Sequence, residues 1–231
     1  MKLNLLLLAP NFLDDFKEKY RNYIYNVFKL FTEKKRQDKL IKIELSSNLS
    51  KLSPFLSKKD FFELFSKLNE ESCDSVRFNL VEAITNLKNL SNLTGYENFI
   101  SESIVSFSHD ESWRVRLMLA KYMEELLILS STITNNSEIN NNLLKSYIKL
   151  LQDSEGEVRS MACKKLDIVS EYLGKEESFD KVLSCLKSLK ADSLSYVRSS
   201  LASIVLSLAP KIGPKKTNEY IFPIFLRFNK R

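Results

Sequence analysis

Glycine and proline are scarce in this chain, with four and five residues among 231. Their scarcity argues against long flexible linkers, and the dispersed glycines do not form the loop that cradles a phosphate. Histidine occurs once, at His109, where we expect it to cap a helix end rather than to transfer protons. We therefore expect no enzymatic activity, no small-molecule substrate, no cofactor and no metal site.

Cysteine is also rare, and Cys73, Cys163 and Cys185 form neither an even disulfide set nor a close metal-ligand pair. No apolar stretch approaches the length of a transmembrane helix, so no membrane contact is expected. The opening residues resemble a signal peptide only superficially, because their apolar run stops after five residues. We expect a cytoplasmic protein, with the nucleus as a second location, and an exposed Cys73.

The net charge of +6 arises from scattered lysines and arginines among almost as many acids. Local clusters occur at Lys34-Lys35-Arg36 and Lys215-Lys216, and no arginine-aromatic platform interrupts them. Paired acids such as Glu124-Glu125 are interpreted as solvated surface. A lysine-rich solvated surface is therefore favoured over a nucleic-acid groove, and no nucleic-acid partner is expected.

A short phrase recurs four times: an acidic residue, four further residues, then valine followed by arginine. The valines stand 39, 43 and 39 residues apart, a period typical of stacked two-helix repeats. The phrases run over Glu71–Arg77, Asp110–Arg116, Asp153–Arg159 and Asp192–Arg198.

Apolar residues at helical spacing follow each valine and also precede each phrase, which predicts pairs of antiparallel helices. The fold class is therefore all-α: an α-solenoid of about five repeats plus an unpaired C-terminal helix. We expect one array over 1–231, with units at 12–55, 57–93, 96–131, 139–174 and 176–213 and a half repeat at 217–231. The predicted stripes of the second helices are Ile41, Leu45, Leu49, Leu52; Val76, Leu80, Ile84, Leu87; Val115, Leu119, Met123, Leu126; Val158, Ala162, Leu166, Val169; and Val197, Leu201, Val205, Leu208.

Three residues mark the ends and bends of these helices. Gly174 and Gly213 each lie 16 residues past their valine, where a helix C-terminus often needs positive φ. Pro223 is expected to kink the last helix, because proline removes a backbone donor.

The acid and the arginine of each phrase are predicted to project along one edge of the stack. The arginine can then reach its own acid or that of the neighbouring repeat, and a bidentate pair would set the angle between repeats. This ladder comprises Arg77, Arg116, Asp153, Arg159, Asp192 and Arg198.

Helix pairs with Asp in the turn and Val-Arg opening the second helix resemble HEAT repeats. From about Phe61 to Leu226 the chain is similar to the middle repeats of the regulatory scaffold subunits of protein phosphatase 2A, as a shortened form. The phrases that carry this resemblance are Asp74-Ser75-Val76-Arg77 with Val81-Glu82-Ala83, Ser112-Trp113-Arg114-Val115-Arg116, Glu155-Gly156-Glu157-Val158-Arg159, Ser200-Leu201-Ala202-Ser203-Ile204 with Leu208-Ala209-Pro210, and Ile221-Phe222-Pro223-Ile224-Phe225-Leu226.

The resemblance implies a noncatalytic scaffold whose intra-repeat turns bind a phosphatase regulatory subunit. It also implies the phosphatase catalytic subunit as a second partner. It places Glu71, Asp74, Asp110, Glu111, Trp113, Arg114, Glu155, Glu157 and Tyr196 on the partner-binding ridge. Trp113 and Arg114 are favoured independently, because tryptophan and arginine are enriched in interface hot spots. Two alternatives stay open: Trp113 packs against its own stack, or the array is a transport or nucleic-acid adaptor unrelated to phosphatase.

Overall fold

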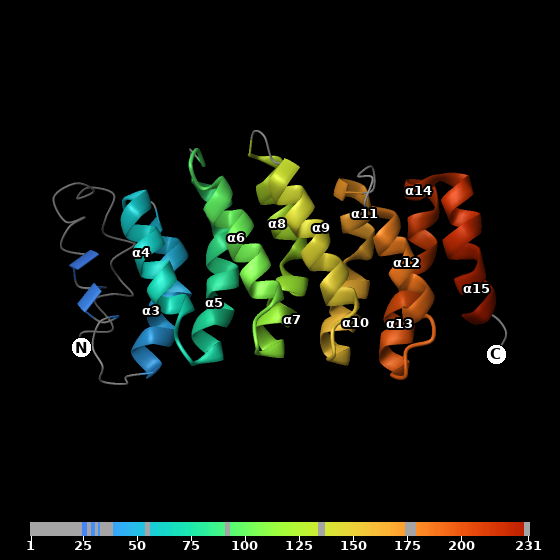
Figure 1. The fold of residues 1–231 in the computed structure, drawn as a ribbon, viewed down its shortest axis with the longest axis horizontal. Helices are drawn as coiled ribbons and strands as arrows, with labels where there is room; N and C mark the ends of the chain where they lie inside the picture. Colours follow the sequence, from blue (N-terminus) through green and yellow to red (C-terminus); the bar gives the residue numbers. More distant parts are fainter. Residues whose placement is uncertain are drawn as a thin grey trace. The chain divides into compact units, whose positions relative to one another are not determined.

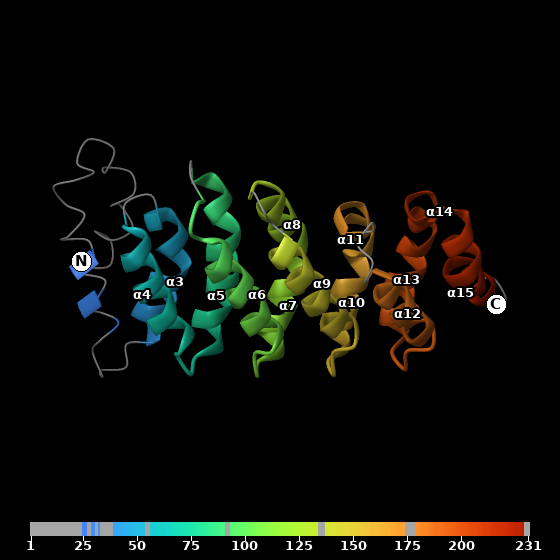
Figure 2. The same cartoon turned by 45° about the horizontal axis from the view of Figure 1, so that its top comes forward.

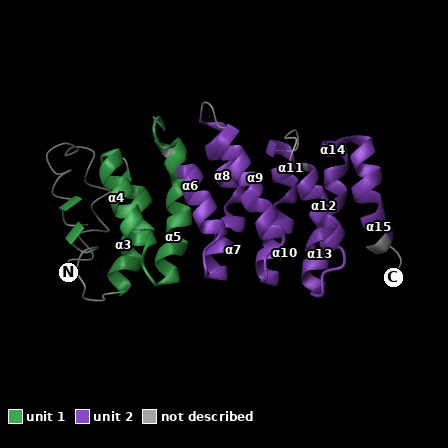
Figure 3. Ribbon diagram, in the orientation of Figure 1, with its two compact units in different colours: residues 1–99 green, residues 100–231 purple. Residues whose placement is uncertain are grey.

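The computed structural model describes residues 25–26, 29–30, 32, 39–53, 56–90, 93–133, 137–173 and 179–228. Its two compact units, residues 1–99 and 100–231, are described one at a time (Figure 3). Every regular element in the described residues is helical (Figure 1). None of the described helices is both long and apolar enough to cross a bilayer. The first part of the predicted unit 12–55, residues 12–31, lies almost entirely outside the described residues.

Unit 1 contains α3 (Lys39–Leu52), α4 (Lys58–Asn69), α5 (Asp74–Thr85) and the 3₁₀ turn η2 (Asn86–Asn89). The hydroxyl of Ser57 accepts a hydrogen bond from the backbone N–H of Asp60 at 3.1 Å, which caps α4. The second helices α3 and α5 pack side by side, and the Asn79 amide on α5 donates to the Ile43 carbonyl on α3 at 3.1 Å.

Unit 2 contains three complete helix pairs, whose first helices are α6 (Glu97–Ser108, begun in unit 1), α9 (Ser137–Leu151) and α12 (Phe179–Leu189). The second helices pack against one another from repeat to repeat, as do α9 and α12 (Figures 1 and 2). Unit 2 is therefore an α-solenoid of two layers, as the sequence predicted. The second helices are α7 (Trp113–Lys121) with α8 (Met123–Ser131), α10 (Gly156–Lys164) with α11 (Leu166–Leu173), and α13 (Ser195–Ile204) with η3 (Val205–Leu208) and α14 (Ala209–Lys216).

The predicted stripes are the core of these pairs, because every member from Leu45 to Leu208 is buried. Ile41, the first member of the weakest stripe, is half-buried. Between the layers, the buried Tyr147 hydroxyl donates to the Ala162 carbonyl at 2.7 Å. Burial of these apolar side chains supplies the main stabilisation of each pair.

In unit 2 each second helix is divided into shorter segments, where the sequence predicted a single helix. They bend at Tyr122, Lys165 and Ile204, each seven residues after its valine, with ψ of 15°, 0° and −18°. The stripe residues Met123, Leu166 and Val205 each directly follow one of these bends and are buried.

The chain after the last full repeat forms the π-helical turn η4 (Thr217–Ile221) and α15 (Phe222–Phe228). Gly213 has a φ of 79°, which confirms the predicted positive-φ glycine. Its backbone angles interrupt the helical conformation within α14. Gly174 lies outside the described residues. The π turn ends immediately before α15, whose second residue is Pro223, so the helix is irregular where a kink was expected.

Candidate protein-interaction surface

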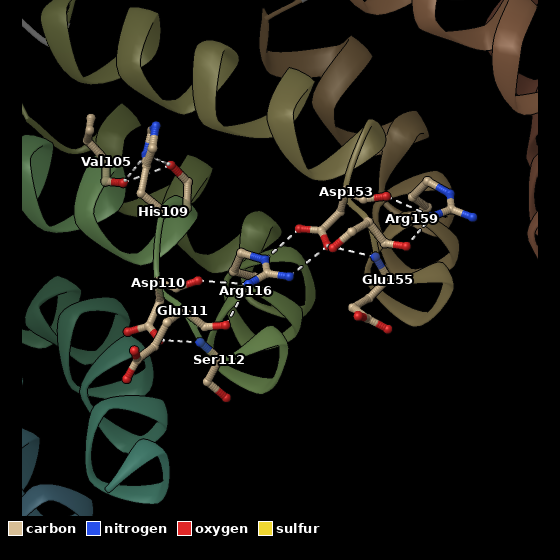
Figure 4. Close-up of polar contacts among 11 residues, drawn as sticks. Val105, His109, Asp110, Glu111, Ser112, Arg116, Asp153, Glu155 and Arg159 are labelled. Atoms are coloured by element: carbon tan, nitrogen blue, oxygen red, sulfur yellow. Dashed lines mark hydrogen bonds and ion pairs between the residues drawn. The ribbon is translucent and has the colours of Figure 1, made fainter. Parts of the chain in front are cut away.

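A bidentate ion pair joins successive repeats of unit 2 along their intra-repeat turns (Figure 4). Arg116 donates from Nε to Asp153 Oδ2 at 2.6 Å and from Nη2 to Asp153 Oδ1 at 2.9 Å. The remaining nitrogen, Nη1, donates to the carbonyls of Asp110 at 2.7 Å and Glu111 at 3.1 Å. Arg116 therefore holds its own turn with one nitrogen and the next repeat with the other two.

The same arrangement recurs one repeat later. Arg159 donates from Nε and Nη2 to the Asp192 carboxylate at 2.7 and 3.0 Å, and from Nη1 to the carbonyls of Asp153 and Ser154 at 2.7 and 3.0 Å. Arg198 likewise donates to the Asp192 and Ser193 carbonyls at 2.6 and 3.0 Å. Of the two partners that the sequence left open, the acid of the following repeat is the one engaged.

Unit 1 contains both kinds of contact, made by different residues. Arg77 Nη1 donates to the Glu71 carbonyl at 2.6 Å, within its own turn. The Glu71 carboxylate lies 2.5 Å from the Lys42 ammonium of the preceding repeat. The weak first repeat, with Ile-Lys in place of Val-Arg, therefore uses its lysine where unit 2 uses arginine.

Each ladder aspartate also shapes its own turn. The Asp153 carboxylate accepts the backbone N–H of Glu155 at 2.9 Å, and Asp192 accepts that of Leu194 at 3.0 Å. Asp110 accepts the N–H of Ser112 at 2.8 Å in the same way. These side-chain turns orient the following helix, which explains why an aspartate opens the phrase.

The hydrogen bonds determine the charge state of these carboxylates. Burial raises the pKa of Asp153, but hydrogen bonds from Arg116 and the Glu155 N–H outweigh burial, and the pKa lies below its ordinary value. Asp192 follows the same balance, with Arg159 and the Leu194 N–H lowering its pKa against burial. Both aspartates are consequently ionised at neutral pH.

The side chains outside the ladder face solvent. Trp113, the first residue of α7, is 37% exposed, and the Arg114 guanidinium lies 5.8 Å from the centroid of its ring. Glu111, Glu155 and Glu157 are exposed on the same turns. Part of the indole and its neighbouring charges are thus open to a partner, while Asp110 is half-buried within its own turn.

Tyr196, 41% exposed, lies over the preceding repeat's turn at Gly156. A Cβ on Gly156 would lie 2.4 Å from the Tyr196 hydroxyl oxygen and 2.2 Å from Leu194 Cδ1. Burial and the neighbouring Glu157 raise the pKa of Tyr196. The absence of a side chain at Gly156 therefore leaves room for Leu194 and Tyr196 to pack on this turn.

Two sequence-based expectations were wrong. Cys73 is buried rather than exposed, because it immediately precedes α5 and packs at its start. Glu124 and Glu125 are not simply solvated: Glu124 pairs with Lys165 of the next repeat at 3.1 Å, and Glu125 Oε2 is buried with no hydrogen-bond partner among the described residues. Neighbouring repeats cover positions that one isolated helix would expose.

His109 lies at the end of α6, where its Nδ1 donates to the Val105 carbonyl at 2.9 Å (Figure 4). This contact caps the helix C-terminus, as expected. The described residues contain no group of three side chains suited to hold a metal ion.

Comparison with known proteins agrees with the repeat pattern. A family model described as PPP2R1A-like HEAT repeat matches residues 136–213. The beta isoform of the 65 kDa regulatory A-type subunit of Homo sapiens serine/threonine-protein phosphatase 2A is 33% identical over 90 residues, which cover 37% of this chain and 15% of that protein. The match thus spans less than a fifth of the relative's own length.

These matches confirm the resemblance to the phosphatase scaffold and the HEAT-repeat character of the solenoid. The relative's name is that of a regulatory subunit, which agrees with the expectation that this chain is not an enzyme.

Proposed function

We propose that this chain is a scaffold of a protein phosphatase 2A complex and that its intra-repeat turns bind a regulatory subunit. The observation that carries the proposal is the Trp113–Arg114 pair, exposed on a turn that the Arg116–Asp153 ion pair holds in place. A large, partly exposed aromatic ring on a rigid support binds at low entropic cost.

The exposed acids of unit 2 extend this surface from turn to turn. Glu111, Glu155 and Glu157 are exposed beside the ladder, and Tyr196 continues the row in the next repeat. The expected regulatory subunit therefore presents a basic surface with an apolar pocket for the indole. The catalytic subunit is a second proposed partner, and the proposed compartment is the cytoplasm, with the nucleus second.

Affinity capture of the intact chain from extract at physiological salt, with identification of the bound proteins, tests this function. Capture of a phosphatase regulatory subunit supports it, whereas capture of transport cargo or nucleic acid without any phosphatase component overturns it.

The variant Trp113→Ala should then weaken binding of the purified regulatory subunit by about 30-fold, since a hot spot contributes about 2 kcal/mol. Tyr172→Ala is a matched control, because Tyr172 is 40% exposed but lies near the end of α11, away from the turns. Unchanged affinity of Trp113→Ala in a calorimetric titration would remove the tryptophan from the interface. Thermal unfolding of both variants reports whether either substitution disturbs the fold.

A further inference from the structure

An open groove of about 460 Å³ lies between two successive repeats of unit 2. One wall is formed by His109 and Asp110 in the turn after α6 and by Arg116 on α7, and the other by Lys145 and Lys149 on α9. Asp153 lies at the end of α9 and joins the walls through its ion pair with Arg116 (Figure 4). A groove of this openness suits a segment of chain better than an enclosed small molecule.

The cationic side chains of this groove differ in whether they form an ion pair. All three side-chain nitrogens of Arg116 donate hydrogen bonds, to the Asp153 carboxylate and to the carbonyls of its own turn. Lys145 is exposed and Lys149 half-buried, and neither ammonium has an acid partner among the described residues. The groove is thus lined by three cationic side chains, with Lys145 and Lys149 beside Arg116, and by the carboxylates of Asp110 and Asp153. The positive charge without an acid partner in the described part of the chain is that of the two lysines.

The neighbouring repeats provide an internal comparison. With the valine-to-valine shift of 39 residues, Lys145 and Lys149 correspond to Ser184 and Ser188 on α12. With the shift of 43 residues, they correspond to Glu102 and Ser106 on α6. The fold therefore does not need lysine at either position, and the paired charge is particular to this groove.

We propose that this groove binds an acidic segment of a protein partner, with Lys145 and Lys149 each pairing with one carboxylate. The lysines stand four residues apart, so their charges are offset by about one helical turn of 5.4 Å and match two separate carboxylates. Bidentate recognition of a phosphate favours a free arginine fork, and the fork of Arg116 is occupied. This inference rests on the proposed function, because the partner would be a protein of the phosphatase complex. The experiment below uses an acidic peptide in place of that partner.

Fluorescence anisotropy of a dye-labelled octapeptide of alternating glutamate and serine, titrated with the intact protein at low salt, measures the site directly. The double variant Lys145→Ser/Lys149→Ser installs the residues of the next repeat and should weaken binding about tenfold. The double variant Lys164→Ser/Lys181→Ser removes the same charge from exposed positions outside the groove and should bind as the parent does. Added salt should weaken the parent far more than the first variant.

Equal affinity of the parent and of Lys145→Ser/Lys149→Ser would overturn the proposal. Tighter binding of a phosphoserine peptide of equal charge, or of a single-stranded oligonucleotide, through the same two lysines would assign the groove to a different occupant. Circular dichroism of each variant checks that the array is intact. Because the titration contains no phosphatase component, its failure leaves the Trp113 test unaffected, and the reverse also holds.

Discussion

Arg116 and Asp153 lie 37 positions apart in the sequence, yet their side chains form a two-point hydrogen-bonded pair at 2.6 and 2.9 Å. The Arg116 side chain is 12% exposed and the Asp153 side chain 3%, so water competes little for either group. Two parallel bonds between planar groups fix orientation as well as distance. The pair therefore sets how one repeat of unit 2 stacks on the next.

Asp153→Asn should lower the free energy of unfolding by about 2 kcal/mol, because Arg116 would keep a largely buried charge without its counter-ion. Asparagine preserves the side-chain oxygen that accepts the Glu155 N–H, so the turn itself is retained. Urea denaturation followed by circular dichroism measures the loss. Glu155→Gln, on an exposed acid of the same turn, is the control and should change stability by less than about 0.5 kcal/mol. Equal midpoints for all three proteins would show that the pair adds no stability.

The lowered pKa of Asp153 and Asp192 predicts acid sensitivity. A carboxylate whose pKa is lower in the folded than in the unfolded chain stabilises the fold fully above the unfolded pKa, about 3.9 for aspartate. That stability is lost as the pH falls below this value through the folded pKa. Melting temperatures measured from pH 7 down to about pH 3 should fall less steeply for Asp153→Asn/Asp192→Asn than for the parent. Parallel profiles would exclude these two carboxylates as the source.

Gly156→Ala should destabilise the array by about 1 kcal/mol, because the added methyl group overlaps the side-chain ends of Leu194 and Tyr196 of the next repeat, which must shift to make room. The backbone of Gly156 is helical, a conformation that favours alanine over glycine, so a loss of stability would come from the overlap alone. A double-mutant cycle in the background Leu194→Ala/Tyr196→Ala isolates this contact, since the overlap disappears there. The same loss of stability in both backgrounds would contradict the packing explanation.

All three cysteines should be unreactive toward Ellman's reagent in the folded protein and fully reactive in denaturant. They are buried and free, and burial together with Asp192 raises the pKa of Cys163 to about 12. Burial also raises the pKa of Cys185. For Cys163 and Cys185 the thiolate, which is the reactive form, is therefore scarce at neutral pH, and burial keeps the reagent away from Cys73. Ser154→Cys, at an exposed turn position, provides a reactive comparison; a native thiol that reacts as fast would contradict the burial.

The repeat register was predictable from sequence because each helix pair buries its own stripe. Val115, Leu119 and Met123 recur at spacings that only an amphipathic helix satisfies, and the structure buries all three. The bend at Tyr122 was not predictable in the same way, since no proline or glycine marks it. It directly precedes Met123, a buried member of the stripe.

The candidate interaction surface was likewise predictable from sequence only in part. Trp113 and Arg114 stand out in the sequence because their residue types are unusual for a polar turn, and both are exposed. Lys145 and Lys149 do not stand out among the scattered lysines. A comparison of equivalent repeat positions distinguishes these two lysines from the others, because the next repeat has serine at both positions.

By itself, the sequence determined the helix pairs, their period and the burial of their apolar stripes, because these depend on contacts within a few turns of the chain. Only the tertiary structure decided that Arg116 pairs with Asp153 of the next repeat, that Gly156 makes room for Tyr196, and that Lys145 and Lys149 border a groove. Each of these depends on how one repeat is placed against another. That placement follows from packing among residues about forty positions apart, a distance over which local periodicity carries no information.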